Sequence, residues 1–346
     1  MRWAVVAQWK RPSMSDVAQL AGVSTQTVSR VINGEPYVKE DKRESVLEAM
    51  HRLHYVPNSA ARAMKTGSFK NIGVVYHTLH PVGNRLALEG IVEAASAQSY
   101  RTSLIHWSSL VSQSNLDESQ TVMRLGEMSI DAAIVIVSSS SESGSATTRM
   151  GRLPVPTVVL GTVVAGDVSS VGIDQATGTE AAVQHLLDLG HATVHHIAGP
   201  APSIHSQSRH HAWRGTLERN SRAVPKVARG DWSPTSGYLA ARELLAGETP
   251  TAIFVANDQM ALGAYRAILE SGLRIPQDIS IIGCDDIDEA CQFPTPLTTI
   301  NQHWDRAGHE TLRVALDMLR TGSPSTVSIP TELVIRKSTA PPQQSA

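Results

Sequence analysis

From residue 16 to residue 33 the chain reads Asp16-Val17-Ala18-Gln19-Leu20-Ala21-Gly22-Val23-Ser24-Thr25-Gln26-Thr27-Val28-Ser29-Arg30-Val31-Ile32-Asn33. This pattern predicts two short amphipathic helices joined by a tight turn at Gly22, which supplies the left-handed geometry that ends a helix. Ser13, with Asp16 three residues later, can form a capping box for the first helix, and Ser24 can cap the second. Two such helices are typical of a helix-turn-helix, whose second helix enters the major groove of DNA.

The second of these helices divides into an apolar and a polar face. Val28, Val31 and Ile32 form its buried side. On the opposite face, a glutamine can pair bidentately with adenine and an arginine with guanine. An ordinary helical hairpin with a polar surface is the alternative interpretation. The residues of this helix that we expect at DNA are Ser24, Thr25, Gln26, Thr27, Ser29, Arg30 and Asn33.

A third helix is predicted from about Lys39 to Leu53, with Val46 and Met50 on its core side. Three helices around a small core make a complete DNA-binding head. The charge distribution agrees, because the first 70 residues carry 11 basic and 6 acidic side chains, a net +5, whereas the remainder carries 19 and 26. The head can therefore attract phosphates although the whole chain has a net charge of −2.

Several motifs of this head resemble the LacI/GalR family of bacterial transcription regulators. They are Asp16-Val17-Ala18, Gly22-Val23-Ser24, Thr27-Val28-Ser29-Arg30-Val31, Asn33 and the stretch Tyr55–Met64, and the resemblance runs from about Ser13 to about Pro341. It implies double-stranded operator DNA as a partner, and a hinge helix that forms on the operator and inserts apolar side chains between base steps. By this resemblance the further DNA contacts are Tyr55, Asn58, Ala61 and Met64, the last standing where the family usually has a leucine.

The roughly 275 residues after the head are too many for one ordinary domain and predict two lobes. Apolar strand-like runs alternate with helices, which predicts parallel sheets covered on both faces. The expected fold class is α/β, with a small all-α head followed by a two-lobed domain that resembles periplasmic sugar-binding proteins. The predicted strands are Ile72–Tyr76, Ala132–Val137, Val158–Leu160, Val194–Ile197, Ile253–Val255 and Ile279–Ile282, and the predicted helices Leu86–Gln98, Gly178–Leu189, Ser236–Ala246 and Gln259–Ser271.

Polar side chains follow three of the predicted strands, at the sheet edge where open parallel sheets bind ligands. Asn257 and Asp285 each come shortly after a strand, and a loop after Val194–Ile197 is expected to reach Arg209. A carboxylate accepts hydrogen bonds, a guanidinium donates them and an amide does both, which suits a ligand with vicinal hydroxyls. We expect Trp232 and Trp304 at this cleft and Trp213 in the core; packing of all three in the interior is the alternative.

The resemblance assigns roles to the same residues. It implies that Arg209, Asn257 and Asp285 hold a galactoside-like sugar, with Trp232, Gln302 and Trp304 beside it and His77 at the rim. Two features depart from the pattern of a sugar-binding member of the family. Gly161 stands where that member has an aspartate that contacts the sugar, and His77 and His205 replace small hydroxyl residues.

The expected organisation is a homodimer with two heads, released from a palindromic operator when a sugar binds. The expected boundaries are a disordered N-terminal extension (1–12), the head (13–58), a hinge helix and linker (59–69), the effector domain (70–337) and a disordered tail (338–346). The tail lacks the leucine heptads that assemble one family member into tetramers, which favours a dimer.

The remaining features argue against other classes of protein. Cys284 and Cys291 form no CxxC or metal-binding spacing, and no run of about 20 apolar residues predicts a membrane helix. We therefore expect a cytoplasmic protein without catalytic residues, metal or cofactor. A corepressor such as a purine stays open as the effector. A solute-binding protein would need a secretory signal, and an α/β enzyme would need a motif such as GxGxxG or GxSxG in its strand–turn–helix context.

Overall fold

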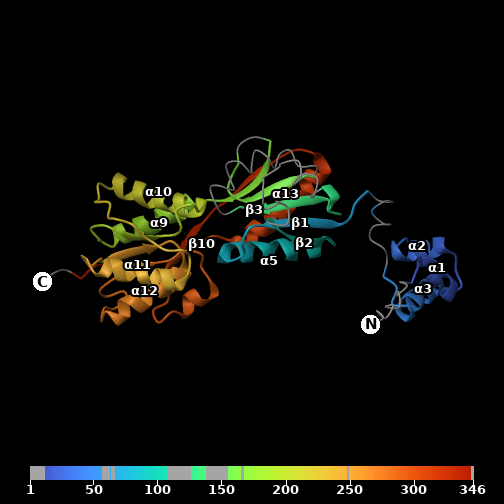
Figure 1. Cartoon of the computed structure of the whole chain (residues 1–346), viewed down its shortest axis with the longest axis horizontal. Helices are drawn as coiled ribbons and strands as arrows, with labels where there is room; N and C mark the ends of the chain where they lie inside the picture. The colour runs from blue at the N-terminus through green and yellow to red at the C-terminus, as the bar shows by residue number, and fades with distance from the viewer. Residues whose placement is uncertain are drawn as a thin grey trace, which may run out of the picture. The chain divides into compact units, whose positions relative to one another are not determined.

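The structure is a computed structural model that describes residues 12–56, 63, 67–107, 126–137, 155–164, 167–247 and 249–343. The chain forms two compact units, Met1–Phe69 and Lys70–Ala346 (Figure 1). Three residues expected to contact DNA from the hinge helix, Asn58, Ala61 and Met64, lie outside the described residues. So do residues 1–11 of the expected N-terminal extension.

The first unit contains the helices α1 (Met14–Ala21), α2 (Thr25–Ile32) and α3 (Glu40–Arg52). The predicted capping box is confirmed: the Ser13 hydroxyl accepts from the backbone N–H of Asp16, and the Asp16 carboxylate accepts from the backbone N–H of Ser13 at 2.7 Å. The three helices bury a small common core, as predicted, formed by Val17, Ala18, Val28, Val31, Val46, Ala49 and Tyr55.

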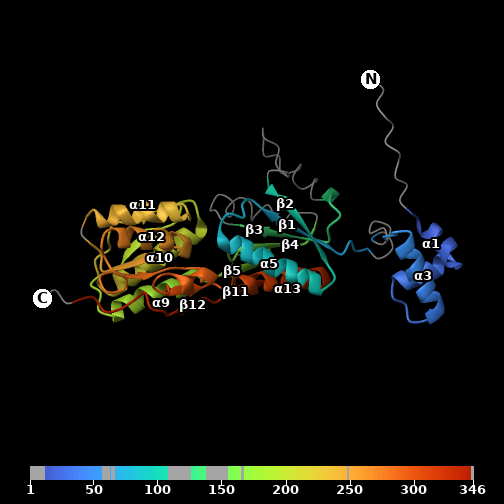
Figure 2. The ribbon, with the colours of Figure 1, turned by 90° about the horizontal axis from the view of Figure 1, so that it is seen from below.

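The first lobe of the second unit is built on a six-stranded sheet with the order β11-β5-β4-β3-β1-β2, in which all neighbours are parallel. The helices α5 (Val82–Ala97) and α13 (Trp304–Thr321) pack side by side against one face (Figure 2). The strands are β1 (Asn71–Tyr76), β2 (Arg101–His106), β3 (Ala132–Ile136), β4 (Thr157–Gly161), β5 (Ser169–Ile173) and β11 (Thr326–Ile329).

The second lobe has a four-stranded parallel sheet with the order β7-β6-β8-β9. Helices cover both faces, because Ile253 and Val255 pack with α11 and α12 while Phe254 packs with α9 and α10. The predicted α/β class is thereby confirmed. The elements are β6 (His195–Ala198), β7 (Ala228–Arg229), β8 (Ala252–Val255), β9 (Ser280–Ile282), α9 (Gln175–Asp188), α10 (Ile204–Arg219), α11 (Pro234–Leu245), α12 (Asp258–Glu270) and the 3-10 helix η1 (Asp288–Gln292).

The chain passes from one lobe to the other after β5, between β10 (Thr299–Asn301) and α13, and between β11 and β12 (Glu332–Val334). β10 and β12 pair in antiparallel fashion. The Thr331 hydroxyl donates to the carbonyl of Asp174 at 2.7 Å and accepts from the Gly178 N–H at 3.0 Å. Two of the crossing segments are therefore hydrogen-bonded to each other.

The expectation of a disordered tail from residue 338 is wrong for residues 338–343. The side chain of Ser338 is fully buried; its hydroxyl donates to the carbonyl of Ile281 at 2.6 Å and accepts from the N–H of Thr298 at 2.8 Å. The N–H of Ile281 in turn donates to the carbonyl of Ser338. The reason is that β9 is an edge strand, and this polar segment satisfies its open hydrogen-bonding groups.

None of the helices in the described parts of the chain combines the length and the apolar composition that crossing a membrane requires.

Candidate functional site

In the head, the outer face of α2 carries the residues expected to read bases. Thr25, Gln26 and Arg30 are exposed, whereas Val28 and Val31 on the opposite face are buried. Side chains that read bases must lie on such an exposed face of the recognition helix; Thr25 and Gln26 lie in its first turn and Arg30 in its last. The structure thus presents these three side chains to solvent in the arrangement that the sequence predicts.

The other polar residues in and next to α2 form hydrogen bonds and an ion pair within the head. The Ser24 hydroxyl accepts from the N–H of Thr27 at 3.1 Å, which caps the helix, and it lies 3.0 Å from the Thr27 hydroxyl. The amide of Asn33 donates to the Ser29 hydroxyl at 3.4 Å. Arg30 forms a half-exposed ion pair with Glu35 at 3.5 Å, an interaction typically worth less than about 1 kcal/mol.

Tyr55 differs from the other residues that we expected at DNA. Its side chain is only 9% exposed and packs in the core of the head with Val46 and Ala49. The fold therefore uses this ring for packing, because it closes the end of the core beyond α3.

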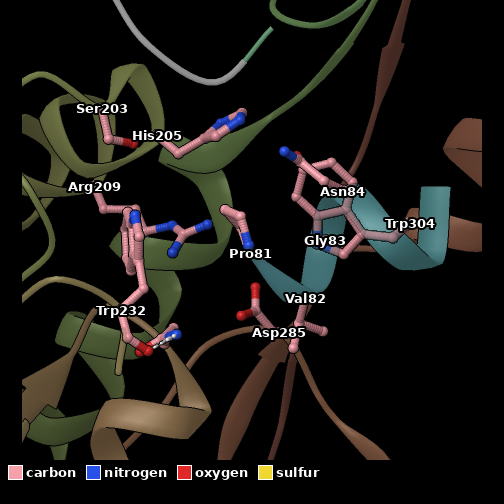
Figure 3. A pocket seen from close by; sticks show the side chains of 11 residues that line it. Pro81, Val82, Gly83, Asn84, Ser203, His205, Arg209, Trp232, Asp285 and Trp304 are labelled. Carbon is pink, nitrogen blue, oxygen red and sulfur yellow. Dashed lines mark hydrogen bonds between the residues drawn. The ribbon is translucent and has the colours of Figure 1, made fainter. Parts of the chain in front are cut away.

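In the second unit, a cavity lies between the two lobes, a position where small-molecule sites commonly form. Five residues predicted at the effector site line it, namely Arg209, Trp232, Asn257, Asp285 and Trp304 (Figure 3). His205, which the resemblance sets in place of a small hydroxyl residue, lines the cavity too. The other lining residues were not assigned to the site from the sequence: Pro81, Val82, Gly83, Asn84 and Ser203.

Two predicted effector residues do not line the cavity. Gln302 is fully buried behind it, where it contacts Arg209 and Asp285. His77 is exposed just after β1, with its ring centroid 6.3 Å from that of His106, so its placement at the ligand is not supported. The His77 ring therefore lies near the end of the neighbouring strand β2, where His106 stands.

Arg209 is carried by α10 and not by a loop as expected. Ser203 caps this helix, and the polar sequence of α10 hides the helical pattern because polar as well as apolar side chains are buried. The guanidinium is 3% exposed and donates to Oε1 of Gln175 at 2.8 Å, to Oε1 of Gln302 at 3.1 Å and to the carbonyl of Ala256. All these acceptors are neutral, and no carboxylate in the described part of the chain forms an ion pair with Arg209 at the cavity wall.

Asp285 follows β9 with a φ of 124°, a conformation that costs about 1–3 kcal/mol and clusters at functional sites. Its carboxylate accepts from the side-chain amide of Gln302. Burial raises the pKa of Asp285 to about 6, although the nearby Arg209 charge opposes this shift. At neutral pH the group is therefore mostly ionised and can accept hydrogen bonds from ligand hydroxyls.

Asn257 has a positioning role. Its side-chain oxygen caps α12 by accepting from the N–H of Met260 at 2.9 Å, and its amide donates to the carbonyl of Trp232 at 3.2 Å. The Trp232 ring in turn lies 5.6 Å from the Arg209 guanidinium, a cation–π contact. Asn257, the Trp232 indole and the Arg209 guanidinium therefore form one wall of the cavity.

Glycines make room for the two indoles. A Cβ on Gly199, just after β6, would overlap the Trp232 ring, and a Cβ on Gly83 in α5 would overlap the Trp304 ring. Each indole thus lies directly against a backbone segment, one in each lobe. This close approach fixes both rings at the cavity.

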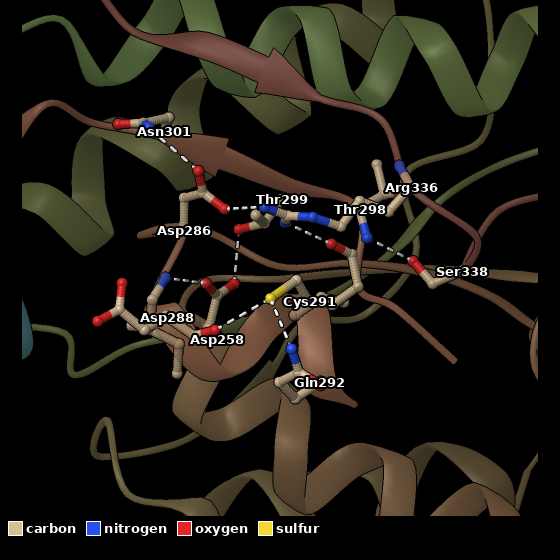
Figure 4. Close-up of polar contacts among 12 residues, drawn as sticks. Asp258, Asp286, Asp288, Cys291, Gln292, Thr298, Thr299, Asn301, Arg336 and Ser338 are labelled. Carbon is tan, nitrogen blue, oxygen red and sulfur yellow. Dashed lines mark hydrogen bonds and ion pairs between the residues drawn. The ribbon is translucent and has the colours of Figure 1, made fainter. Parts of the chain in front are cut away.

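Two more carboxylates lie near Asp285 but do not line the cavity. Asp258 is fully buried and accepts from the Thr299 hydroxyl at 2.6 Å and from the N–H of Ile287 at 3.0 Å (Figure 4). Burial, reinforced by the Asp285 charge, raises the pKa of Asp258 to about 7. Asp286 pairs with Arg336 at 2.6 Å. The Asp258 contacts join the start of α12 to β10, and the Asp286 carboxylate is engaged by Arg336 and by the amide of Asn301.

Each of the two units is similar to a known protein family. Residues 13–58 match the family of bacterial regulatory proteins, lacI family, and residues 183–339 match the periplasmic binding protein-like domain. The lactose operon repressor of Escherichia coli is 33% identical over 338 residues, which cover 96% of this chain and 92% of that protein. The transcriptional repressor PurR of Yersinia enterocolitica is 33% identical over 340 residues, covering 95% and 97%.

Solved structures show the same similarity. A lac repressor dimer bound to operator and the anti-inducer ONPF superposes with a TM-score of 0.82 at 32% identity, covering 96% of this chain and all of that one. A complex of the transcriptional regulator CelR with cellobiose gives a TM-score of 0.68 at 29% identity, covering 95% of this chain and all of that one.

Proposed function

The chain belongs to the lacI family of bacterial regulatory proteins, a DNA-binding transcriptional repressor, and we propose that a neutral sugar bound in the inter-lobe cavity releases it from its operator. The observation that carries this proposal is the composition of the cavity wall. The wall combines two charged groups, two side-chain amides and two indole rings, each ring packed against a glycine. These lining residues are Arg209, Asp285, Asn84, Asn257, Trp232 and Trp304. Polar groups that both donate and accept, beside aromatic faces, match the hydroxyl edges and apolar faces of a pyranose ring.

The Arg209 network offers a route from the ligand to the lobes. Gln175 begins α9 just after one crossing segment, and Gln302 lies in another. The Nε2 amide of Gln175 donates to Oε1 of Gln302 at 2.6 Å, and both glutamines accept from Arg209. A ligand that engages Arg209 and Asp285 therefore biases the segments about which the lobes can re-angle.

Release from DNA is then a population shift between two states. The sugar must bind the state that cannot hold the operator more tightly than the state that can. We propose that the protein acts in the cytoplasm as a homodimer, that its two heads occupy the half-sites of a palindromic operator, and that it has no enzymatic activity. Thr25, Gln26 and Arg30 are the proposed base readers.

A purine corepressor is the second candidate, because the chain is as similar to PurR as to the lactose operon repressor. A purine would stack on Trp232 or Trp304 and would strengthen operator binding instead of weakening it. The two functions therefore predict opposite signs for the effect of the ligand.

The test is an operator gel shift with the purified full chain, using the palindrome upstream of its own gene. A panel of galactosides, glucosides, cellobiose, hypoxanthine and guanine is added at increasing concentration. Sugar-dependent release supports the proposal. Equal operator affinity across all the sugars would exclude induction by them, and tighter binding with a purine would establish the second candidate.

A further inference from the structure

Asp258 does not line the cavity, but it is bound to the turn that presents Asp285. It is fully buried at the first position of α12. Its backbone N–H donates to the carbonyl of Cys284 at 2.8 Å, one residue before Asp285. Its Oδ2 accepts from the N–H of Ile287 at 3.0 Å, two residues after Asp285. Asp258 is therefore hydrogen-bonded to this turn on both sides.

The turn needs such contacts because its backbone is strained. Asp285 has a φ of 124° and Asp286 a φ of 54°. Each such conformation costs about 1–3 kcal/mol and persists only where the surrounding structure holds it. A Cβ built on Gly283 would overlap Oδ1 of Asp258, so the glycine before the turn leaves space for this carboxylate. The Asp258 side chain is thus packed directly against the backbone that leads into the turn.

The second oxygen of Asp258 connects the turn to β10. The Thr299 hydroxyl lies 2.6 Å from Oδ1 of Asp258 (Figure 4). A hydroxyl can donate to an ionised carboxylate and accept from a protonated one, so this contact is compatible with both forms of the acid. β10 leads directly to Gln302, whose amide donates to the Asp285 carboxylate. Asp258 therefore joins the turn to the segment that also orients Asp285.

The charges around Asp258 are mostly negative, and in the described part of the chain no basic side chain forms an ion pair with it. The nearby cations act on its neighbours, since Arg209 lies close to Asp285 and Arg336 pairs with Asp286. Burial and the Asp285 charge raise the pKa of Asp258 to about 7, so both of its forms occur at neutral pH. The other titratable groups here are Tyr265 and Cys284, both neutral because burial raises their pKa, and the exposed Asp288 and Glu289 of η1.

Resting on the proposed sugar-dependent function, we propose that Asp258 is a positioning residue that holds the Asp285 carboxylate at the cavity, and that sugar binds best while Asp258 is protonated. Sugar hydroxyls require the ionised form of Asp285. A second negative charge buried beside it costs free energy, and the cost rises when a ligand displaces water from the site. Loss of the Asp258 proton therefore weakens sugar binding although Asp258 does not contact the sugar.

Four variants of the full chain separate the hydrogen bonds from the charge. Asp258→Asn imitates the neutral acid, because its amide can accept from the Ile287 N–H and donate to the Thr299 hydroxyl. Asp258→Ala removes both contacts, and Thr299→Val removes one of them while keeping the shape of the side chain. Asp278→Asn is the matched control, because this carboxylate of the same lobe pairs with Arg274 outside the cavity. Circular dichroism shows which variants are folded.

Calorimetric titration with methyl galactoside, methyl glucoside and cellobiose at pH 7 and pH 8.5 measures the effect. We expect the wild-type chain and Asp278→Asn to lose about threefold in affinity over this range and Asp258→Asn to lose none. Asp258→Ala should bind about tenfold more weakly at both values. Thr299→Val should lose its affinity at higher pH than wild type, because the Thr299 hydrogen bond lowers the pKa of Asp258.

Wild-type affinity in both Asp258→Ala and Thr299→Val would overturn the positioning role. The same loss above pH 7 in Asp258→Asn as in wild type would overturn the role of the proton. If the wild-type chain binds none of the sugars, the proposed function fails and the positioning of Asp285 for a sugar fails with it. Thermal unfolding tests the buried charge without sugar: the raised pKa means that wild type loses stability relative to Asp258→Asn as the pH rises from 5 to 8, and a constant difference would contradict it.

Discussion

At the scale of single residues, Arg30, a proposed base reader, forms an ion pair within the head. Its guanidinium lies 3.5 Å from the Glu35 carboxylate, and both side chains are about half exposed. The pair is weak enough to exchange for a guanine, whose O6 and N7 accept a bidentate arginine. The negative charge of Glu35 would oppose the approach of DNA phosphates.

Arg30→Ala should therefore weaken operator binding by about 1–3 kcal/mol and relax base preference at one position in each half-site. Glu35→Ala is the matched variant and should bind the operator as tightly as wild type or more tightly, because it releases Arg30 and removes a repulsive charge. Gel shifts against operators altered at single positions measure both. Unchanged affinity and specificity in Arg30→Ala would contradict its assignment as a base reader.

Asp285 makes a second residue-scale prediction, the pH dependence of sugar binding. Its pKa is raised to about 6, so the carboxylate that is proposed to accept a sugar hydroxyl is ionised above this pH and loses its charge as the pH falls through it. Sugar affinity should decrease from pH 7.5 to pH 5, whereas His205, with a pKa of about 3, contributes no change in this range.

Calorimetry across this pH range measures the effect, with Asp285→Asn as the control. The asparagine cannot ionise and should bind sugar weakly at every pH. Buried Asp258 titrates in both proteins, and its pKa is lower in Asp285→Asn because the Asp285 charge that raises it is gone. The same pH profile in both proteins would show that the Asp285 carboxylate is not the acceptor.

At the scale of elements, the cavity depends on where strands and helices end. Gly199 follows β6 and Gly83 lies in the first turn of α5, and each allows an indole to rest on the backbone. α10 supplies Arg209 and His205 from one turn and the next of the same helix face. The cavity wall thus depends on two element ends and one helix.

Gly199→Ala should displace the Trp232 ring and weaken sugar binding by about tenfold, because the indole loses its place at the cavity wall. Gly215→Ala is the matched control on α10, where an added Cβ would meet only the flexible end of Arg219, at 3.3 Å. It should leave sugar binding unchanged and stabilise the protein by roughly 0.5–1 kcal/mol. Calorimetry and thermal unfolding separate the two effects; equal sugar affinity in both variants would refute the role of the indole.

At the scale of the whole molecule, sugar and operator must affect each other by the same factor. Linkage requires that if sugar lowers operator affinity, the operator lowers sugar affinity equally, typically by about 5–150-fold. Gln302 joins Arg209 to Asp285 within a segment that crosses between the lobes. It is therefore placed to transmit ligand binding to the lobes.

Gln302→Leu should reduce this coupling factor more than it reduces the affinity for the operator alone. The factor is measured twice, as operator affinity with and without saturating sugar and as sugar affinity with and without operator. The two values should agree in each protein. A variant with the wild-type factor would show that coupling takes another route through the fold.

The sequence alone was sufficient for features that depend on neighbouring residues. The caps at Ser13 and Ser24, the turn at Gly22 and the apolar face of α2 all follow from local spacing, as does the alternation of apolar strands with helices. Polar residues after β8 and β9 predicted Asn257 and Asp285, because parallel strands end at a common edge.

Only the tertiary structure decided what depends on contacts between distant segments. The sequence of α10 is too polar to be recognised as a helix from its apolar spacing. Residues 338–343 are ordered because they hydrogen-bond to the edge strand β9. The side chain of Tyr55 packs in the core of the head. Gly161, at the end of β4 in one lobe, lies close to His205 on α10 in the other, since a Cβ on Gly161 would be 3.7 Å from the Nε2 of His205. Local patterns report which face of an element is apolar, whereas burial, pKa shifts and unsatisfied polar atoms arise only when segments far apart in the chain enclose a common space.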